Sequence, residues 1–293
     1  MAIRRLFIAN RGEIAVRIIQ TAGDLGIETV LGVSAADRDS LGARLADRPV
    51  GLGPGPSRES YLKGDTVVQA ALGTGCDGLQ PGYGFLSENR ALAEACEKAG
   101  IVFVGPMVGN LEALGDKLTA RGHAEAAGVP LVPGGTAATL DGAQAVGHPL
   151  LIRAVAGGGG RGMKRVDRAG ELGPSPDMAM AEAEAAIDDG RVYLERFVTR
   201  GRHVEVQIIS DGETALHAGD CDCSIQRRYQ KVVEEAPVPG LPVALRDGLL
   251  QAAIRYARHI GYRSLGTVEF LVDVGRDRFN FLEMNARIQG SIR

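Results

Sequence analysis

The chain of 293 residues is long enough for about two domains, and it can bury a sizeable core without disulfides. Its 45% hydrophobic and 24% charged residues are typical of globular proteins, and its net charge of -3 argues against broad binding to nucleic acid or anionic membranes. The four cysteines lack the spacing of a zinc site or a disulfide framework, and no apolar run has the length of a signal peptide or membrane span. We therefore expect a cytoplasmic protein that holds any anion locally.

The first hundred residues alternate short apolar runs, such as 4–10, 27–33 and 100–105, with helical spacing, as in 13–25. This alternation predicts a parallel α/β sheet with crossover helices. Residues 10–13, Asn-Arg-Gly-Glu, connect the first strand to the first helix. They could present backbone donors to an anion, or they could form an ordinary strand-to-helix turn.

Two prolines and two glycines in 129–136 predict a boundary before a smaller unit. Beyond it, the pattern predicts strands over 148–155, 163–166, 191–198 and 202–210, helices over 177–188 and roughly 243–260, and paired strands over 266–274 and 279–289.

A glycine-rich segment lies between the two predicted strands that precede residue 167. It contains Gly157, Gly158, Gly159, Gly160, Arg161 and Gly162. The segment fits neither common phosphate-binding fingerprint, because it has no Gly-Lys-Ser/Thr and a strand rather than a helix follows it. It could be a hairpin whose backbone N–H groups hold a polyphosphate, with Arg161 and Lys164 adding charge, or a flexible linker. The apolar flanks favour the hairpin, because linkers usually lie in polar sequence.

The last predicted strand carries polar side chains at every second position. Alternation places Glu283, Asn285, Arg287 and Gln289 on one face and Leu282, Met284, Ala286 and Ile288 on the other. Glu283 and Asn285 offer hard oxygen ligands for Mg²⁺, and Glu269 on the neighbouring strand could supply a second carboxylate. Arg287 would then point at a substrate anion. The pattern alone favours the alternative, an ordinary strand with its polar side in water.

Many segments resemble one family in the family's own order. They include "IANRGEIAVRII", "PGYGFLSEN", "GDKLTAR", "AGVPLVPG", "GGGGRGM", "RHVEVQI", "DCSIQRRYQKVVEEAP" and "FLEMNARIQ". The chain resembles biotin carboxylase, the ATP-grasp component of biotin-dependent carboxylases, over essentially its whole length. The resemblance implies a Rossmann-like α/β domain over 1–114 and an ATP-grasp domain over 115–293, with a lid over about 131–204.

The resemblance also implies roles for individual residues. Residues implied to contact ATP are Lys117, Arg153, the glycine-rich segment from Gly157 to Gly162 with Arg161, Glu195, Arg196, Val198, His203 and Gln226. Glu269, Glu283 and Asn285 match ligands of Mg²⁺ or Mn²⁺, and Lys231, Arg287 and Gln289 match active-site residues near bicarbonate. Arg153 stands where the family has a lysine, so a planar guanidinium group replaces a compact ammonium group.

The implied chemistry has two steps. Bicarbonate attacks the γ-phosphate of ATP to give carboxyphosphate and ADP, and the carboxyl group then passes to N1 of biotin on a carrier protein or domain. The implied partners are that biotin carboxyl carrier, a carboxyltransferase component and a second copy in a homodimer, with neither nucleic acid nor membrane. The acceptor would be that of an acetyl-CoA, propionyl-CoA or pyruvate carboxylase, the first of which serves fatty acid biosynthesis.

The chain departs from the family in several places. After Gln289 it ends within four residues, where the family continues through a glutamate that acts as general base, so we expect a chain truncated at its C-terminal side. The alternative function is a truncated or degenerate homologue that binds nucleotide or a partner without efficient turnover. Gln80, Cys221 and Tyr229 replace a family histidine, arginine and histidine, and Cys223 is expected to be structural rather than nucleophilic.

Overall fold

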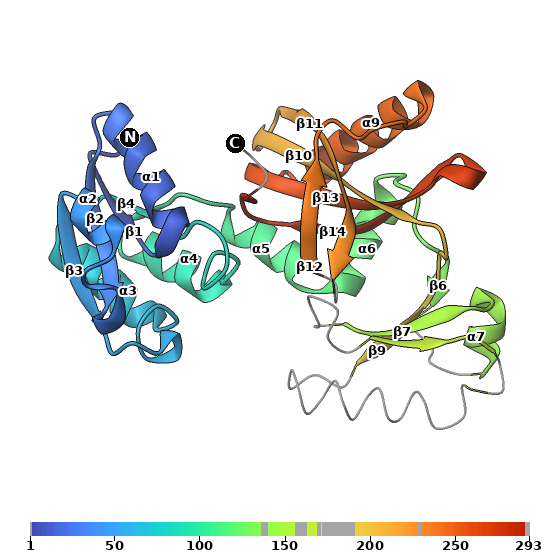
Figure 1. Cartoon of the computed structure of the whole chain (residues 1–293), viewed down its shortest axis with the longest axis horizontal. Helices are drawn as coiled ribbons and strands as arrows, with labels where there is room; N and C mark the ends of the chain where they lie inside the picture. The colour runs from blue at the N-terminus through green and yellow to red at the C-terminus, as the bar shows by residue number, and fades with distance from the viewer. Residues whose placement is uncertain are drawn as a thin grey trace. The chain divides into compact units, whose positions relative to one another are not determined.

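The structure is a computed structural model that describes residues 2–135, 140–155, 163–168, 171, 191–227 and 230–290. The chain divides into two compact units (Figure 1). The first unit comprises Met1–Glu112, Tyr262–Gly266 and Ala286–Arg293, and the second comprises Ala113–Gly261 and Thr267–Asn285.

The first unit is built on a parallel five-stranded sheet in the order β3-β2-β1-β4-β5. Its strands are β1 (Arg5–Ile8), β2 (Glu28–Ser34), β3 (Arg48–Gly53), β4 (Gly78–Gln80) and β5 (Val102–Phe103). The helices are α1 (Gly12–Asp24), α2 (Leu41–Leu45), α3 (Gly64–Gly73), α4 (Arg90–Lys98) and α5 (Val108–Gly115), the last of which leads into the second unit. The predicted parallel α/β sheet is thus confirmed.

Alternate residues of β1 supply the two cores of this unit. Phe7 belongs to the cluster on one side of the sheet, whereas Leu6 and Ile8 belong to the cluster on the other. Helix α1 covers the second cluster with Ala15, Ile19 and Ala22, which recur at helical spacing. A parallel sheet buried on both faces needs the continuous apolar runs that the sequence contains.

The second unit is built on an antiparallel sheet in the order β12-β11-β10-β13-β14. Its strands are β10 (Arg202–Asp211), β11 (Ala215–Arg227), β12 (Gln230–Glu235), β13 (Arg263–Asp273) and β14 (Arg278–Asn285). Helices α6 (Lys117–Ala126) and α9 (Val243–His259) pack against this sheet. Tyr256 of α9 contacts both α6 and the sheet: its hydroxyl donates to Ala120 O of α6 at 3.1 Å, and its ring centroid lies 4.7 Å from that of Phe281 in β14.

A smaller sheet in the second unit has the order β6-β9-β7-β8. It contains β6 (Gly134–Gly135), β7 (Leu150–Ala154), β8 (Met163–Val166) and β9 (Val192–Arg196), with helix α7 (Leu140–Val146) beside it. Strands β7 and β8 pair in antiparallel fashion, so the strands predicted on either side of the glycines are confirmed. The glycine-rich segment Gly157–Gly162 and the helix predicted over 177–188 lie outside the described residues.

The predicted alternation of faces from 282 to 289 is wrong in two respects. Glu269 lies opposite Glu283 while Phe270 lies opposite Phe281, so Leu282 is one extra residue in β14, a β-bulge. The bulge leaves Leu282 partly exposed, although the prediction placed it on the apolar face, and the preceding Phe281 is fully buried. The strand also ends at Asn285, so the residues that follow it bend away from strand geometry and do not continue the face.

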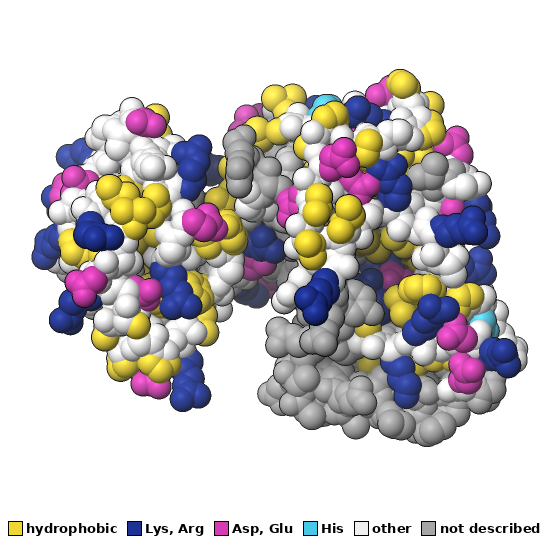
Figure 2. All heavy atoms as spheres, viewed as in Figure 1, with side chains coloured by type: hydrophobic (Ala, Val, Ile, Leu, Met, Phe, Trp, Pro, Cys, Tyr) yellow, Lys and Arg dark blue, Asp and Glu magenta, His cyan; other side chains and the backbone are white. Residues whose placement is uncertain are grey.

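The surface carries charged side chains of both signs. In Figure 2, basic and acidic side chains are interspersed over the visible face of each unit rather than gathered by sign. In the described part of the chain, every helix is too short or too polar to cross a bilayer.

Candidate active site

Two carboxylates face each other across β13 and β14. Glu269 and Glu283 are directly opposed in the register, which places their side chains on the same face of the sheet. Burial, together with the negative charge of Glu269, raises the pKa of Glu283. Asn285 lies two residues further along the same strand, and its Nδ2 donates to Glu269 Oε1 at 2.6 Å. The group concentrates negative charge and amide oxygen at one place, which is the donor set that suits Mg²⁺.

Basic side chains from the neighbouring strands lie against this acidic pair. His203 Nε2 lies 2.9 Å from Glu269 Oε2 and 3.3 Å from Glu205 Oε1. Burial opposes its charge, but the two nearby carboxylates of Glu205 and Glu269 prevail and raise the pKa of His203 to about 10. Lys231 bonds to Glu205 and lies 3.6 Å from Glu269; burial lowers its pKa, yet these two carboxylates produce a net rise. The positive charges of His203 and Lys231 therefore balance the negative charges of Glu205 and Glu269.

Gln226 ties the histidine to the next strand. Its Nε2 lies 3.1 Å from His203 Nδ1 and donates to Cys223 O at 2.8 Å. Gln226 is also the register partner of Lys231 across β11 and β12. The amide thus fixes the His203 ring relative to β11.

A buried ion triad lies at the small sheet. Glu195 accepts from Arg121 Nη1 at 2.5 Å through one carboxylate oxygen and from Arg153 Nη1 at 2.6 Å through the other. Both guanidinium groups also lie over the ring of Tyr193, at 5.6 and 5.8 Å from its centroid. The carboxylate of Glu195, which is 3% exposed, therefore holds Arg153 in place.

One hydrogen-bond donor of Arg153 takes no part in the triad. Arg153 Nε is buried and makes no hydrogen bond within the described protein. Lys117, the first residue of α6, is close enough for burial and the charge of Arg153 to lower its pKa, although Glu283 and Glu195 act in the opposite direction. Two cations and an unused donor beside the acidic pair fit an anionic ligand that brings its own metal.

The remaining predicted ligands around β9 have other contacts. Arg196 Nε donates to Val146 O at 2.9 Å, and the backbone N–H of Arg196 donates to Pro133 O at 2.8 Å. Val198 lies just beyond β9 and is partly exposed. The roles of Arg196, Val198 and Glu195 in contacting ATP stay predictions.

Arg287 and Gln289 belong to the first unit. Glu88 holds the segment there, since its two carboxylate oxygens accept from Ala286 N and from Arg287 Nε, both at 3.0 Å. Gln289 is buried and lines a cavity of about 470 Å³ in this unit. The other lining residues are Glu13, Ile14, Arg17, Ile18, Tyr83, Ile288 and Gly290.

Asn10 supports one wall of that cavity. Its Nδ2 donates to Pro81 O at 2.7 Å and to Tyr83 O at 2.9 Å, which fixes the turn that carries Tyr83. Gly82 has φ +67° in this turn, and a Cβ there would lie 2.5 Å from Ile14, so only glycine fits. The polar residue after β1 therefore serves the local turn, whatever else the segment 10–13 does.

Sequence reasoning missed three residues of these networks, and two of them carried a signal. Glu205 follows His203 by two positions in a strand, so both had to share a face. Arg121 follows Lys117 by four positions in a helix and shares its side. Glu88 had no such signal, because its partners lie about 200 residues away in sequence.

The chain matches two family models that together cover almost all of it. Residues 116–292 match the ATP-binding domain of the carbamoyl-phosphate synthase L chain, and residues 2–111 match the N-terminal domain of biotin carboxylase. The fold and the charged site thus define an α/β protein with an ATP-grasp type of nucleotide-binding domain. The chain belongs to the biotin carboxylase family.

Curated relatives and solved structures agree with this assignment. Biotin carboxylase of Pseudomonas aeruginosa is 46% identical over 98% of this chain, and the alpha subunit of mitochondrial methylcrotonoyl-CoA carboxylase of Arabidopsis thaliana is equally so. A biotin carboxylase structure from Campylobacter jejuni, in complex with β-γ-ATP, superposes with a TM-score of 0.95 at 41% identity over 99% of this chain. The biotin carboxylase domain dimer of 2-oxoglutarate carboxylase from Hydrogenobacter thermophilus, in complex with MgADP and bicarbonate, superposes with a TM-score of 0.92 at 37% identity, also over 99% of this chain.

The chain spans only part of these relatives. It covers 65% of the Pseudomonas enzyme, 40% of the Arabidopsis subunit, 66% of the Campylobacter chain and 65% of the Hydrogenobacter chain.

Proposed function

We propose that this chain carries the nucleotide-binding part of a biotin carboxylase, which uses ATP and bicarbonate to carboxylate biotin on a carrier protein or domain. The observation that carries the proposal is the opposed pair Glu269 and Glu283, with Lys231 and His203 on the same sheet and Lys117 and Arg153 beside it. The family membership and the ligands named for the Campylobacter and Hydrogenobacter structures support it.

The acidic pair fits a divalent cation. The raised pKa of Glu283 reflects burial and repulsion by Glu269, and a cation between such carboxylates would relieve both. Glu269, Glu283 and the side-chain oxygen of Asn285 would hold Mg²⁺ or Mn²⁺, which neutralises charge on the transferring phosphoryl group. The chain's own contribution is to keep these oxygens on one sheet face.

The cations would hold the nucleotide. Glu195 and Arg121 fix the Arg153 guanidinium, so its unused Nε–H keeps a constant direction toward an acceptor. Lys117 adds a second positive charge at the start of α6. His203 and Gln226 are proposed to contact the nucleotide as a hydrogen-bonded pair.

The groups proposed for bicarbonate and biotin are Lys231, Arg287 and Gln289. Lys231 carries a proton firmly, as the rise in its pKa indicates, so it would serve as a cation rather than a base. Glu88 orients the Arg287 fork in the first unit. A carrier, a carboxyltransferase and a second copy of the chain are the proposed partners, and the cytoplasm is the proposed location.

Calorimetric titration with Mg·ATP tests the proposal on the chain itself. We expect heat of binding from the wild type and from Glu125→Gln, an exposed control on α6, but at least tenfold weaker binding by Glu283→Gln. Bicarbonate-dependent ATP hydrolysis by the same preparations separates turnover from binding. Binding without hydrolysis would favour a homologue that binds nucleotide without efficient turnover, and a folded chain without heat of binding would refute the proposed site.

A further inference from the structure

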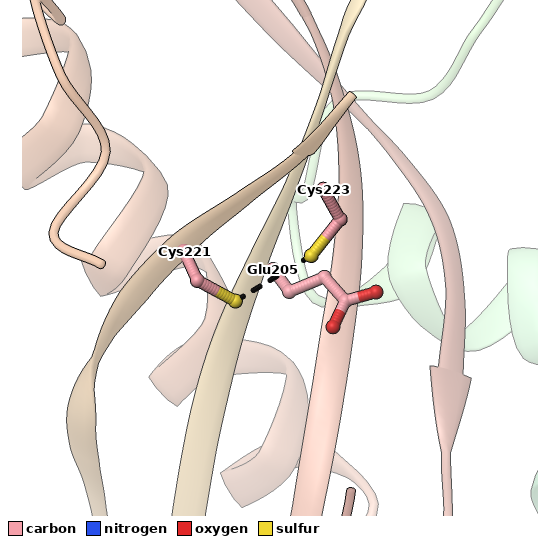
Figure 3. A group of neighbouring side chains, drawn as sticks. All are labelled: Glu205, Cys221 and Cys223. Carbon is pink, nitrogen blue, oxygen red and sulfur yellow. Dashed lines mark hydrogen bonds between the residues drawn. The ribbon is translucent and has the colours of Figure 1, made fainter. Parts of the chain in front are cut away.

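Two buried thiols and a carboxylate meet on neighbouring strands of the large sheet. Cys221 and Cys223 are two positions apart in β11, and their Sγ atoms lie 3.6 Å from each other. Glu205 of β10 is the register partner of Cys221, so its side chain lies on the same face (Figure 3). All three residues are buried, with exposures of 4% for Cys221 and 0% for Cys223 and Glu205.

The spacing of the ligand atoms suits a single tetrahedral metal ion. Two thiolates that each bind zinc at about 2.3 Å lie about 3.8 Å apart, close to the separation of the two Sγ atoms. One ligand atom from each of the three residues lies within 4.8 Å of the other two. Little side-chain movement would therefore bring all three atoms to one centre.

Glu205 also has an atom in need of a partner. Its Oε2 is buried and makes no hydrogen bond among the described residues, while its Oε1 receives Lys231. Burial of a carboxylate oxygen without a partner is unfavourable, because the oxygen loses its hydrogen bonds to water. A bound cation beside the thiols would satisfy it.

We propose that Cys221, Cys223 and Glu205 form a binding site for a thiophilic divalent cation of the zinc class, with water as a fourth ligand. Binding releases one proton from each thiol, so the ion's two charges are balanced by two thiolates and the local net charge with Glu205 and Lys231 is unchanged. Sulfur ligands select zinc over Mg²⁺, whereas the oxygen ligands of Glu269 and Glu283 select Mg²⁺. The proposal is independent of the proposed carboxylation.

The binding test uses the reduced full chain with Zn²⁺ and with Co²⁺ as a spectroscopic probe. We expect one equivalent of tightly held Zn²⁺ and, with Co²⁺, a thiolate-to-metal charge-transfer band in the near ultraviolet. The band should be lost in Cys221→Ala and Cys223→Ala but retained in Cys96→Ala, which removes a buried thiol of the first unit. Saturating Mg²⁺ should leave it unchanged, because oxygen ligands give no such band.

Circular dichroism and thermal unfolding establish whether the variants fold. A second measurement, on the wild type alone, covers the case in which they do not: Zn²⁺ should slow alkylation of Cys221 and Cys223 at least tenfold, but not that of Cys76 and Cys96. A wild type without the charge-transfer band, a band that persists in folded Cys221→Ala, or alkylation unaffected by Zn²⁺ would each overturn the proposal.

Discussion

The triad of Glu195, Arg121 and Arg153 allows a sharp test of how the two arginine side chains are held. Glu195→Gln keeps the shape of the side chain but removes its charge, and the amide NH₂ must then face a guanidinium donor. The two arginine side chains are only 12% and 13% exposed, so water cannot replace the lost acceptor fully. Removing one partner of a buried ion pair typically costs about 3 to 5 kcal/mol.

We therefore expect Glu195→Gln to lower the free energy of unfolding of the second unit by about 3 to 5 kcal/mol, which is a fall in Tm of about 10 °C for a domain of this size. Urea unfolding followed by circular dichroism measures the change. The control is Glu94→Gln, which breaks the exposed pair of Arg90 and Glu94 at 2.7 Å and should cost less than about 0.5 kcal/mol. Equal costs for the two variants would refute the reasoning.

Three further predictions concern the acid side of stability, the bulge and the acidic pair. Burial raises the pKa of Asp37, but hydrogen bonds from Ser34 and Tyr61 prevail and leave it below the ordinary 3.8. The ionised Asp37 therefore contributes fully to the free energy of unfolding above about pH 5, and this contribution is lost as the pH falls through the pKa of the folded state. In Asp37→Asn, the free energy of unfolding measured in urea should fall less steeply than in the wild type between pH 5 and pH 3. An equally steep fall in the two proteins would contradict this prediction. Phe281→Ala should cost about 3 to 5 kcal/mol in urea unfolding and Leu282→Ala much less, whereas strict alternation predicts the reverse order. Glu283→Gln should raise the Tm of the metal-free protein, because it removes a buried charge repelled by Glu269, while a lowered Tm would contradict this origin of the raised pKa.

The sequence predicted those parts of the fold in which burial leaves a periodic pattern. The apolar runs of β1 and β2 and the helical spacing of α1 follow directly from their two-sided cores. The sequence did not predict strands β11 and β12. Strand β12 lies at the edge of its sheet and exposes even Val232 and Val233. An edge strand of this kind has no alternation for a pattern to detect.

The candidate site was predictable where residues share one strand and less so where strands meet. Glu283 and Asn285 follow from alternation, but their pairing with Glu269 depends on a register that the bulge at Leu282 shifts by one residue. The engagement of Arg153 by Glu195 depends on strands β7 and β9 being neighbours. These contacts are tertiary, and local sequence contains no record of them.

The order of the large sheet explains why Lys231 and the two cysteines affect each other. Strand β11 separates β12 from β10, and the register places Lys231 opposite Gln226 and Glu205 opposite Cys221, so the lysine reaches the carboxylate across β11. Only a long side chain can cross the intervening strand. The thiols of Cys221 and Cys223, on the intervening strand, lie beside the same carboxylate that receives the lysine. A cation on the thiols would take the remaining oxygen of Glu205 while Lys231 keeps the other, so the proposed metal site and the charge balance around Glu269 would meet at this one carboxylate.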